Sequence, residues 1–169
     1  MTLGAGAMLI GGTAGTFWFG GYRINTTPSY PLGLWQIEPL KRQVRTGDRI
    51  FICLPEGDAA TLALKRRYLP RGLCPSGSGP LIKMVVAAAG QVIEVNEQVV
   101  VDGTPLTSSH VHDADGEGRS LPIYAGGVVG KGHVFLHSDF EGSYDSRYFG
   151  PVPTSGALGL AREVFTYAP

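Results

Sequence analysis

The chain opens with a run that contains no charged residue and no histidine, from Met1 to Tyr22. As a helix, this run would be about 33 Å long, which is comparable with the hydrocarbon core of a bilayer at about 30 Å. Trp18 and Tyr22 lie near its end, where amphipathic rings favour the membrane interface, and Arg23 follows as the first charge. The run lacks the basic start and the short apolar core of a secretory signal peptide. We therefore expect residues 1–22 to form an uncleaved transmembrane anchor.

Beyond the anchor, short apolar segments alternate with turn signals, which is typical of antiparallel β-strands. The pattern predicts strands at 47–55, at 81–95 with a turn at Gly90, at 97–106 with an Asp-Gly turn signal, and at 131–140. The segments 75–80 and 107–120 are interpreted as loops. Only 58–68 has a helical pattern, with Asp58 as a candidate N-cap. We expect one mainly β domain over residues 23–169.

The composition agrees with this pattern and narrows the set of partners. A chain of 169 residues is long enough for one domain with its own core. Its 25 glycines and 12 prolines leave little room for long helices. Lys and Arg number 14, and Asp and Glu also number 14, so the formal net charge is zero. Without a net positive field, the chain is not expected to bind nucleic acid.

Two residues are candidates for a catalytic dyad. Ser29 lies between Pro28 and Pro31, whose fixed φ angles would hold the serine hydroxyl in one orientation. Lys83 is the single lysine of an apolar stretch, LIKMVV. Burial there would lower the pKa of its amine and allow it to accept a proton from a serine near neutral pH. The alternatives are a serine in an ordinary turn and a lysine whose amine reaches water.

Four blocks of the sequence resemble those of the type I signal peptidases, in the same order along the chain. They are TPSYPLG, GDRIFI at 47–52, LIKMVVAAAGQVIEV at 81–95 and GSYDSRYFGPV at 142–152. The first and last are similar to segments of the conjugative-transfer branch, the TraF-type peptidases. This resemblance implies a signal-peptidase-type antiparallel β domain with one N-terminal transmembrane helix. It also implies a serine endopeptidase in the bacterial inner membrane, facing the periplasm, without a cofactor or a metal.

The resemblance assigns roles to individual residues. Ser29 matches the nucleophile, and Lys83 matches the general base. Thr27 matches a position whose hydroxyl forms an oxyanion hole together with the Ser29 backbone N–H. Ser143 matches a serine that orients the lysine amine.

The block that contains Asp145 and Arg147 matches a pair that supports the site in this family. Asp145 is then either a third catalytic residue or one half of a structural ion pair. Two features depart from the housekeeping signal peptidases. Tyr30 and Pro31 directly follow the matched nucleophile, and the segment before Asp145 lacks the Gly-Asp-Asn-Arg run. Both departures favour a specialised substrate.

The two cysteines, Cys53 and Cys74, flank the predicted helix, and they form either one disulfide or two free thiols. In an oxidising compartment a disulfide here would stabilise the fold by about 3 kcal/mol in the chain-entropy model. The resemblance favours the disulfide, because signal peptidases act on the outer side of the inner membrane. We expect residues 53–80 to form a disulfide-capped helical insertion.

The histidines suggest rival mechanisms. His110 and His112 alternate on one segment, but this segment is polar and offers no third metal ligand. His137, Ser138 and Asp139 are the residue types of a catalytic triad, yet an adjacent Ser and His do not normally face each other on a strand. We expect neither a metal site nor a histidine-based triad.

The function expected from the resemblance is processing of a pilin precursor for conjugative transfer. The acyl-enzyme is released either by water or by the amino terminus of the substrate itself, which would cyclise the pilin head to tail. The expected partners are this precursor or another membrane-tethered preprotein, the lipid bilayer, and components of a conjugative type IV secretion system. Two alternatives are a general type I signal peptidase and a non-catalytic, membrane-anchored assembly factor.

Overall fold

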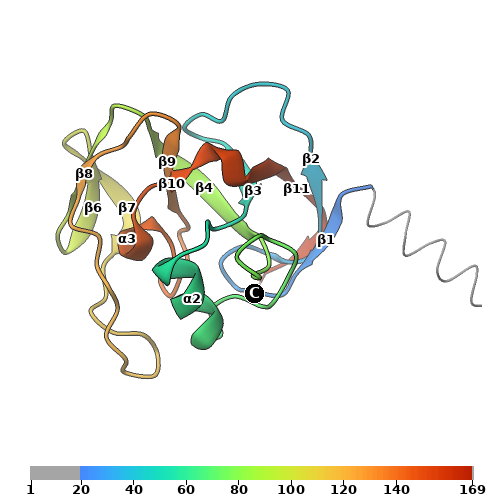
Figure 1. The fold of residues 1–169 in the computed structure, drawn as a ribbon, viewed down its shortest axis with the longest axis horizontal. Helices are drawn as coiled ribbons and strands as arrows, with labels where there is room; N and C mark the ends of the chain where they lie inside the picture. The colour runs from blue at the N-terminus through green and yellow to red at the C-terminus, as the bar shows by residue number, and fades with distance from the viewer. Residues whose placement is uncertain (1–19, 169) are drawn as a thin grey trace, which may run out of the picture.

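The computed structural model describes residues 20–168, which form two antiparallel sheets and a few short helices (Figure 1). The strands are β1 (Tyr22–Asn25), β2 (Leu32–Glu38), β3 (Arg49–Ile52), β4 (Leu81–Ala88), β5 (Val92–Val95), β6 (Gln98–Val101), β7 (Thr104–His110), β8 (Gly127–Val128), β9 (His133–His137), β10 (Val152–Pro153) and β11 (Ala157–Tyr167). The helices are α2 (Asp58–Lys65), α3 (Ser146–Phe149) and the 3₁₀ turn η1 (Thr154–Gly156). The expectation of a mainly β fold is confirmed.

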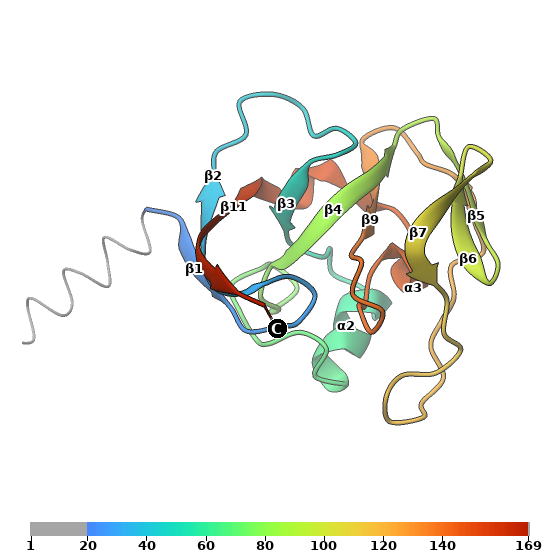
Figure 2. The same ribbon diagram turned by 180° about the vertical axis from the view of Figure 1, so that it is seen from behind.

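The larger sheet has seven strands in the order β1-β2-β11-β3-β4-β9-β10. Strand β11, the last along residues 20–168, therefore lies between β2 and β3, and Figure 2 shows it passing between them. Its register changes at a β-bulge between Glu163 and Phe165, where it pairs with β2. Gly33 of β2 lies beside this part of β11, and a Cβ there would come within 2.4 Å of the Phe165 carbonyl oxygen. Only glycine allows the two backbones to approach so closely.

Strand β4 is buried on both faces of this sheet. Leu81 and Val85 belong to the main core cluster, whereas Ile82 packs with Trp35 on the opposite face. Lys83 lies between Leu81 and Val85 on the main-core face and is directly opposite Ile50 of β3. The apolar sequence around Lys83 therefore places its amine among aliphatic side chains, where the charged form of the amine is disfavoured.

The smaller sheet has the order β7-β6-β5-β8, and its Ile93 and Val99 pack against Phe135 of β9 in the larger sheet. The Asp-Gly turn predicted within 97–106 separates two strands, β6 and β7. The loop predicted for 107–120 is wrong at its start, because β7 continues to His110. Its polar sequence misled the prediction because most of β7 is exposed, so that few of its side chains need to be apolar.

The insertion (residues 53–80) connects β3 to β4 and contains α2, within the predicted helix 58–68. Asp58 is the first residue of this helix and not its N-cap. The N-cap is Gly57, whose φ of 147° is strained for residues that have a Cβ. Cys53 and Cys74 form a disulfide with their Cα atoms 5.5 Å apart, so that both ends of the helical segment are tied together.

The predicted anchor, residues 1–22, lies outside the described residues as far as position 19. Its last residue, Tyr22, is the first residue of β1. Among residues 20–168 no helix has the length and apolar character needed to cross a membrane.

Candidate active site

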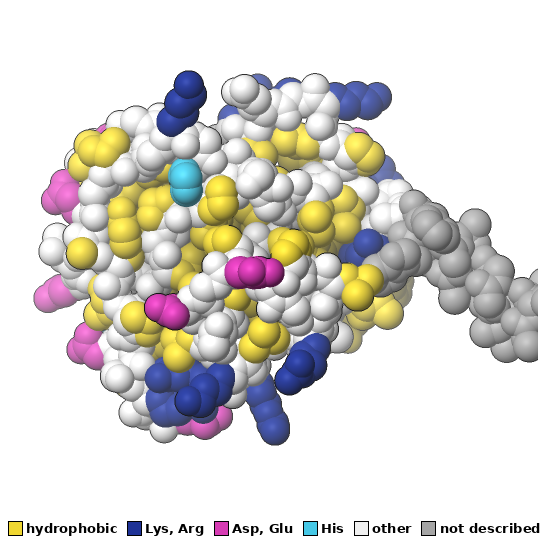
Figure 3. Space-filling model, in the orientation of Figure 1, with side chains coloured by type: hydrophobic (Ala, Val, Ile, Leu, Met, Phe, Trp, Pro, Cys, Tyr) yellow, Lys and Arg dark blue, Asp and Glu magenta, His cyan; other side chains and the backbone are white. Residues whose placement is uncertain are grey.

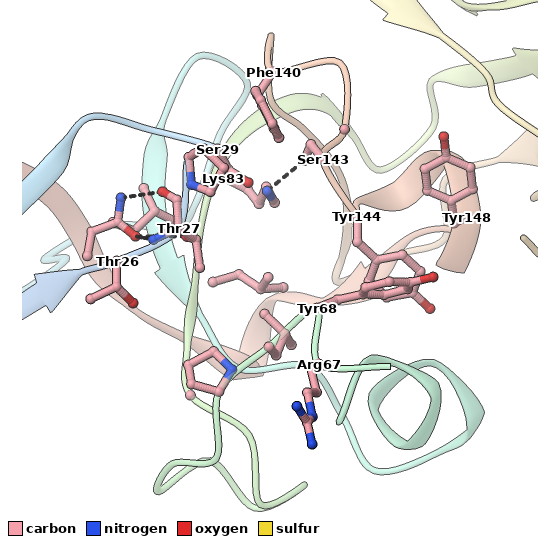
Figure 4. Close-up of a pocket in the computed structure, with 18 of the residues that line it drawn as sticks. Thr26, Thr27, Ser29, Arg67, Tyr68, Lys83, Phe140, Ser143, Tyr144 and Tyr148 are labelled. Atoms are coloured by element: carbon pink, nitrogen blue, oxygen red, sulfur yellow. Dashed lines mark hydrogen bonds between the residues drawn. The ribbon is translucent and has the colours of Figure 1, made fainter. Parts of the chain in front are cut away.

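A cleft of about 980 Å³ lies between the β1–β2 connection, the insertion and the segment that precedes α3. Its lining includes Ser29, Thr27, Lys83 and Ser143. Figure 4 shows the side chains of Ser29 and Lys83 converging at one end of this cleft, with tyrosines along its other wall. In the space-filling view, apolar side chains occupy much of the middle of the molecule, and Lys and Arg lie mainly around its margin (Figure 3). The lining of the cleft itself includes apolar and aromatic side chains, among them Phe51, Leu69 and Tyr144, which suits an apolar ligand.

The loop of residues 26–31 joins β1 to β2 and carries the predicted nucleophile, Ser29, at its centre, so it is named the nucleophile loop. Two side chains from other elements hold its backbone. The indole Nε1 of Trp35 donates to the Pro31 carbonyl at 2.9 Å, and the hydroxyl of Ser138 donates to the Ser29 carbonyl at 2.6 Å. Trp35 is fully buried, so the C-terminal side of the loop is attached to the core of the sheet.

Asn25, the last residue of β1, holds the rest of this loop, and the sequence analysis missed it. Its amide Nδ2 lies within 3.0 Å of the carbonyl oxygens of Thr27, Tyr30 and Pro31. Its Oδ1 accepts from the Thr27 N–H at 3.1 Å and from the Thr27 hydroxyl at 2.8 Å. Dashed lines in Figure 4 mark the contacts at Thr27. The spacing Asn-x-Thr, typical of an Asx turn, was the signal that could have found it.

Lys83 is 2% exposed and donates a hydrogen bond of 2.7 Å to the hydroxyl of Ser143. Burial lowers the pKa of its amine to about 8, an effect that the carboxylate of Asp145 opposes and the guanidinium of Arg147 reinforces. With this pKa, roughly a tenth of the amine is neutral at pH 7, whereas a lysine at its ordinary pKa is almost wholly protonated there. Ser29, Lys83 and Ser143 therefore line one cleft, and within it the Lys83 amine is hydrogen-bonded to Ser143.

The depressed pKa of Lys83 predicts a pH-dependent cost of folding. Because the pKa is about 8 in the folded chain and 10.5 ordinarily, the unfolded chain binds more protons between these values. The stability of the wild type is therefore expected to rise by about 2 kcal/mol, relative to a Lys83→Met variant, between pH 7 and pH 9.5. Urea unfolding of both chains at the two pH values measures this difference. A constant difference would show that Lys83 titrates normally.

Asp145 and Arg147 form an ion pair that is 0% exposed on both sides. Nε and Nη2 of Arg147 donate to the two carboxylate oxygens of Asp145 at 2.9 and 3.0 Å. Nη1 also donates to the His110 carbonyl oxygen, and Nη2 to the Ser143 carbonyl oxygen. Asp145 also caps α3 by accepting from the Arg147 N–H. Burial would raise the pKa of Asp145, but neighbouring His137 and Arg147 outweigh it and lower this pKa to about 2.

Neither residue of this pair lines the cleft, and the hydrogen bond of Lys83 goes to Ser143. Asp145 therefore contacts Arg147 and the start of α3 outside the cleft lining, and Arg147 in turn binds the Ser143 carbonyl oxygen. The negative charge of Asp145 attracts the Lys83 ammonium without a direct hydrogen bond, and this attraction raises the pKa of the Lys83 amine.

The residues of the rival mechanisms are used differently. The hydroxyl of Ser138 is bonded to the Ser29 carbonyl, and Nδ1 of the buried His137 lies 3.5 Å from Oδ2 of Asp145. His112 lies 3.3 Å from Glu141 at the rim of the cleft. Within residues 20–168, no group of three or more His, Cys, Asp or Glu side chains is arranged to hold a metal ion.

The chain is similar in sequence to known proteins of one family. The family model for signal peptidase, peptidase S26, matches residues 2–166. The chain is 56% identical to a probable conjugal transfer protein TraF of Sinorhizobium fredii, over 94% of this chain and 84% of that protein. It is 50% identical to a conjugal transfer protein TraF of Agrobacterium fabrum, over 99% of this chain and 95% of that protein. Among solved structures, a signal peptidase I from Enterococcus faecalis V583 is 18% identical, with a TM-score of 0.40, over 70% of this chain and 98% of that chain.

Proposed function

The chain belongs to the signal peptidase family, peptidase S26, and from this membership we propose that it is a serine endopeptidase with a Ser29/Lys83 dyad. The observation that carries the proposal is the buried Lys83 amine, with a pKa lowered to about 8, at the end of the cleft that Ser29 also lines. A lysine that is partly neutral at working pH can act as a general base, whereas an exposed lysine cannot.

The proposed reaction begins with proton transfer from the Ser29 hydroxyl to the neutral amine of Lys83. The Ser29 oxygen attacks the scissile carbonyl, and the oxyanion receives hydrogen bonds from the Ser29 N–H and the Thr27 hydroxyl. Lys83, now protonated and held by Ser143, donates its proton to the departing amine. The resulting acyl-enzyme ester is released by an incoming water or an incoming amine.

The substrate that we propose is a pilin precursor of a conjugative system, since the relatives named above are conjugal transfer proteins. The enzyme would be held in the inner membrane by residues 1–22, with its catalytic domain in the periplasm. The Cys53–Cys74 disulfide supports an oxidising compartment, because such bonds persist there. An extended segment of the precursor would lie in the cleft across Ser29.

The proposal predicts a change in the mass of the pilin. Donor cells that lack the chain are expected to contain only unprocessed pilin precursor, and cells that again carry the full chain are expected to contain a shortened pilin. Mass spectrometry of the pilin measures this directly, and a product that is one water lighter than the trimmed peptide reports cyclisation.

Two outcomes would contradict the proposal. An identical pilin mass in cells with and without the chain would favour an assembly factor without peptidase activity. Accumulation of many secreted preproteins in cells that lack the chain would favour a general signal peptidase.

A further inference from the structure

The amide of Asn25 can adopt only one orientation in the structure. Its Nδ2 faces three carbonyl oxygens, and its Oδ1 faces the Thr27 N–H and hydroxyl. Rotating the amide by half a turn would place its NH₂ against the Thr27 N–H and its oxygen against the carbonyls. The amide therefore fixes where the carbonyls of Thr27, Tyr30 and Pro31 point, and these carbonyls flank Ser29 on both sides.

Thr27 has one hydroxyl proton, and in the structure this proton is directed at Asn25 Oδ1. The same proton is the one that the proposed reaction requires at the oxyanion. The Thr27 N–H also donates to Oδ1 and stays there when the hydroxyl turns away. When the hydroxyl turns away, Asn25 Oδ1 loses one of its two hydrogen bonds from Thr27. It keeps the other, from the Thr27 N–H, so this acceptor is not left without a partner.

We propose that Asn25 is the positioning residue of the oxyanion site. It shapes the nucleophile loop, and its Oδ1 holds the Thr27 hydroxyl by a hydrogen bond until an oxyanion forms. This inference rests on the proposed peptidase function. When the Ser29 oxygen attacks, the Thr27 hydroxyl exchanges Asn25 Oδ1 for the oxyanion, which is the stronger acceptor because it is charged. No covalent bond of Asn25 changes, and the hydrogen bond from the Thr27 N–H to Oδ1 keeps the loop in place.

The test compares wild type, Asn25→Ala, Thr27→Val and the double variant as full chains in detergent, with the full-length pilin precursor as substrate. Each single variant is expected to lower kcat by about 100-fold with little change in KM. The double variant is expected to lose much less than the product of the two, because Asn25 acts partly through Thr27. Asn96→Ala, at an exposed asparagine, is the matched control and should retain wild-type kcat.

Asn25→Asp keeps both acceptor contacts with Thr27 but removes the donors to the three carbonyls, so it tests the loop-shaping role in a chain of nearly the same shape. It is expected to lose kcat as well. Wild-type kcat in Asn25→Ala or in Asn25→Asp, or losses that multiply in the double variant, would overturn the inference. Failure of the wild type itself to cleave would instead overturn the proposed function.

Discussion

Replacing Lys83 with methionine is expected to lower kcat for cleavage of the pilin precursor by about 1,000-fold or more, and Ser29→Ala is expected to have an effect of similar size. Without the amine, the Ser29 hydroxyl has no acceptor for its proton; without the hydroxyl, no acyl-enzyme forms. Because the two groups act as one unit, the double variant should lose no more than either single variant. The measurement is the rate of precursor cleavage by the purified full chains.

The kcat/KM of the wild type is also expected to depend on pH. Only the neutral amine accepts a proton, and its pKa is about 8, so kcat/KM should rise about tenfold per pH unit below pH 8 and level off above it. Lys83→Arg should not restore activity, because a guanidinium stays protonated at every working pH.

Matched controls separate this effect from general damage. Lys131 and Ser155 are both exposed, and Lys131→Met and Ser155→Ala should cleave at wild-type rates. Substantial cleavage by Lys83→Met, or a rate that is independent of pH between 6 and 9, would contradict the assignment of Lys83 as the base.

Replacing Arg147 with methionine is expected to destabilise the folded chain by about 3–5 kcal/mol, because it leaves the fully buried Asp145 carboxylate without its partner. The carbonyl oxygens of Ser143 and His110 lose donors at the same time. Denaturant unfolding with the disulfide intact measures the loss, which is a large part of the stability of an ordinary domain. Asp145→Ala should be damaging for the same reason.

A surface ion pair provides the control for the loss of stability expected in Arg147→Met. Arg49 and Glu163 are about one third exposed, and Glu163→Gln is expected to cost less than about 1 kcal/mol. Because the pKa of Asp145 is lower in the folded chain than ordinarily, its contribution is present above about pH 4 and is lost as pH falls toward 2. An Arg147→Met chain with wild-type stability would mean that Asp145 is protonated or solvated in that variant.

The elements that could be predicted from the sequence are those whose burial shows in the local pattern of apolar residues. Strand β4 is the clearest case, because an uninterrupted apolar run must be buried on both faces, and a lysine in such a run must lose its water. The order of the four sequence blocks then suggested which hydroxyl the amine would meet. Ser29 and Lys83 do line one cleft.

Strand β11 could not be predicted in the same way. Most of its side chains are exposed or half-buried, so its sequence carries no clear alternation. It is held by main-chain pairing with β2 and β3, which are distant in sequence. Asn25 was missed for a related reason: a polar residue at a strand end resembles any turn residue until the chain folds back and brings three carbonyls to it.

The position of β11 in the larger sheet has a consequence for the order in which the cleft is assembled. Within this sheet, the hairpin that presents Ser29 adjoins β3 and β4 only through β11, which is synthesised after every other described strand. A nascent chain that has not yet reached residues 157–167 therefore lacks the strand that joins Ser29 to Lys83 within the sheet. The two residues should take up their places in the cleft only once β11 has been made.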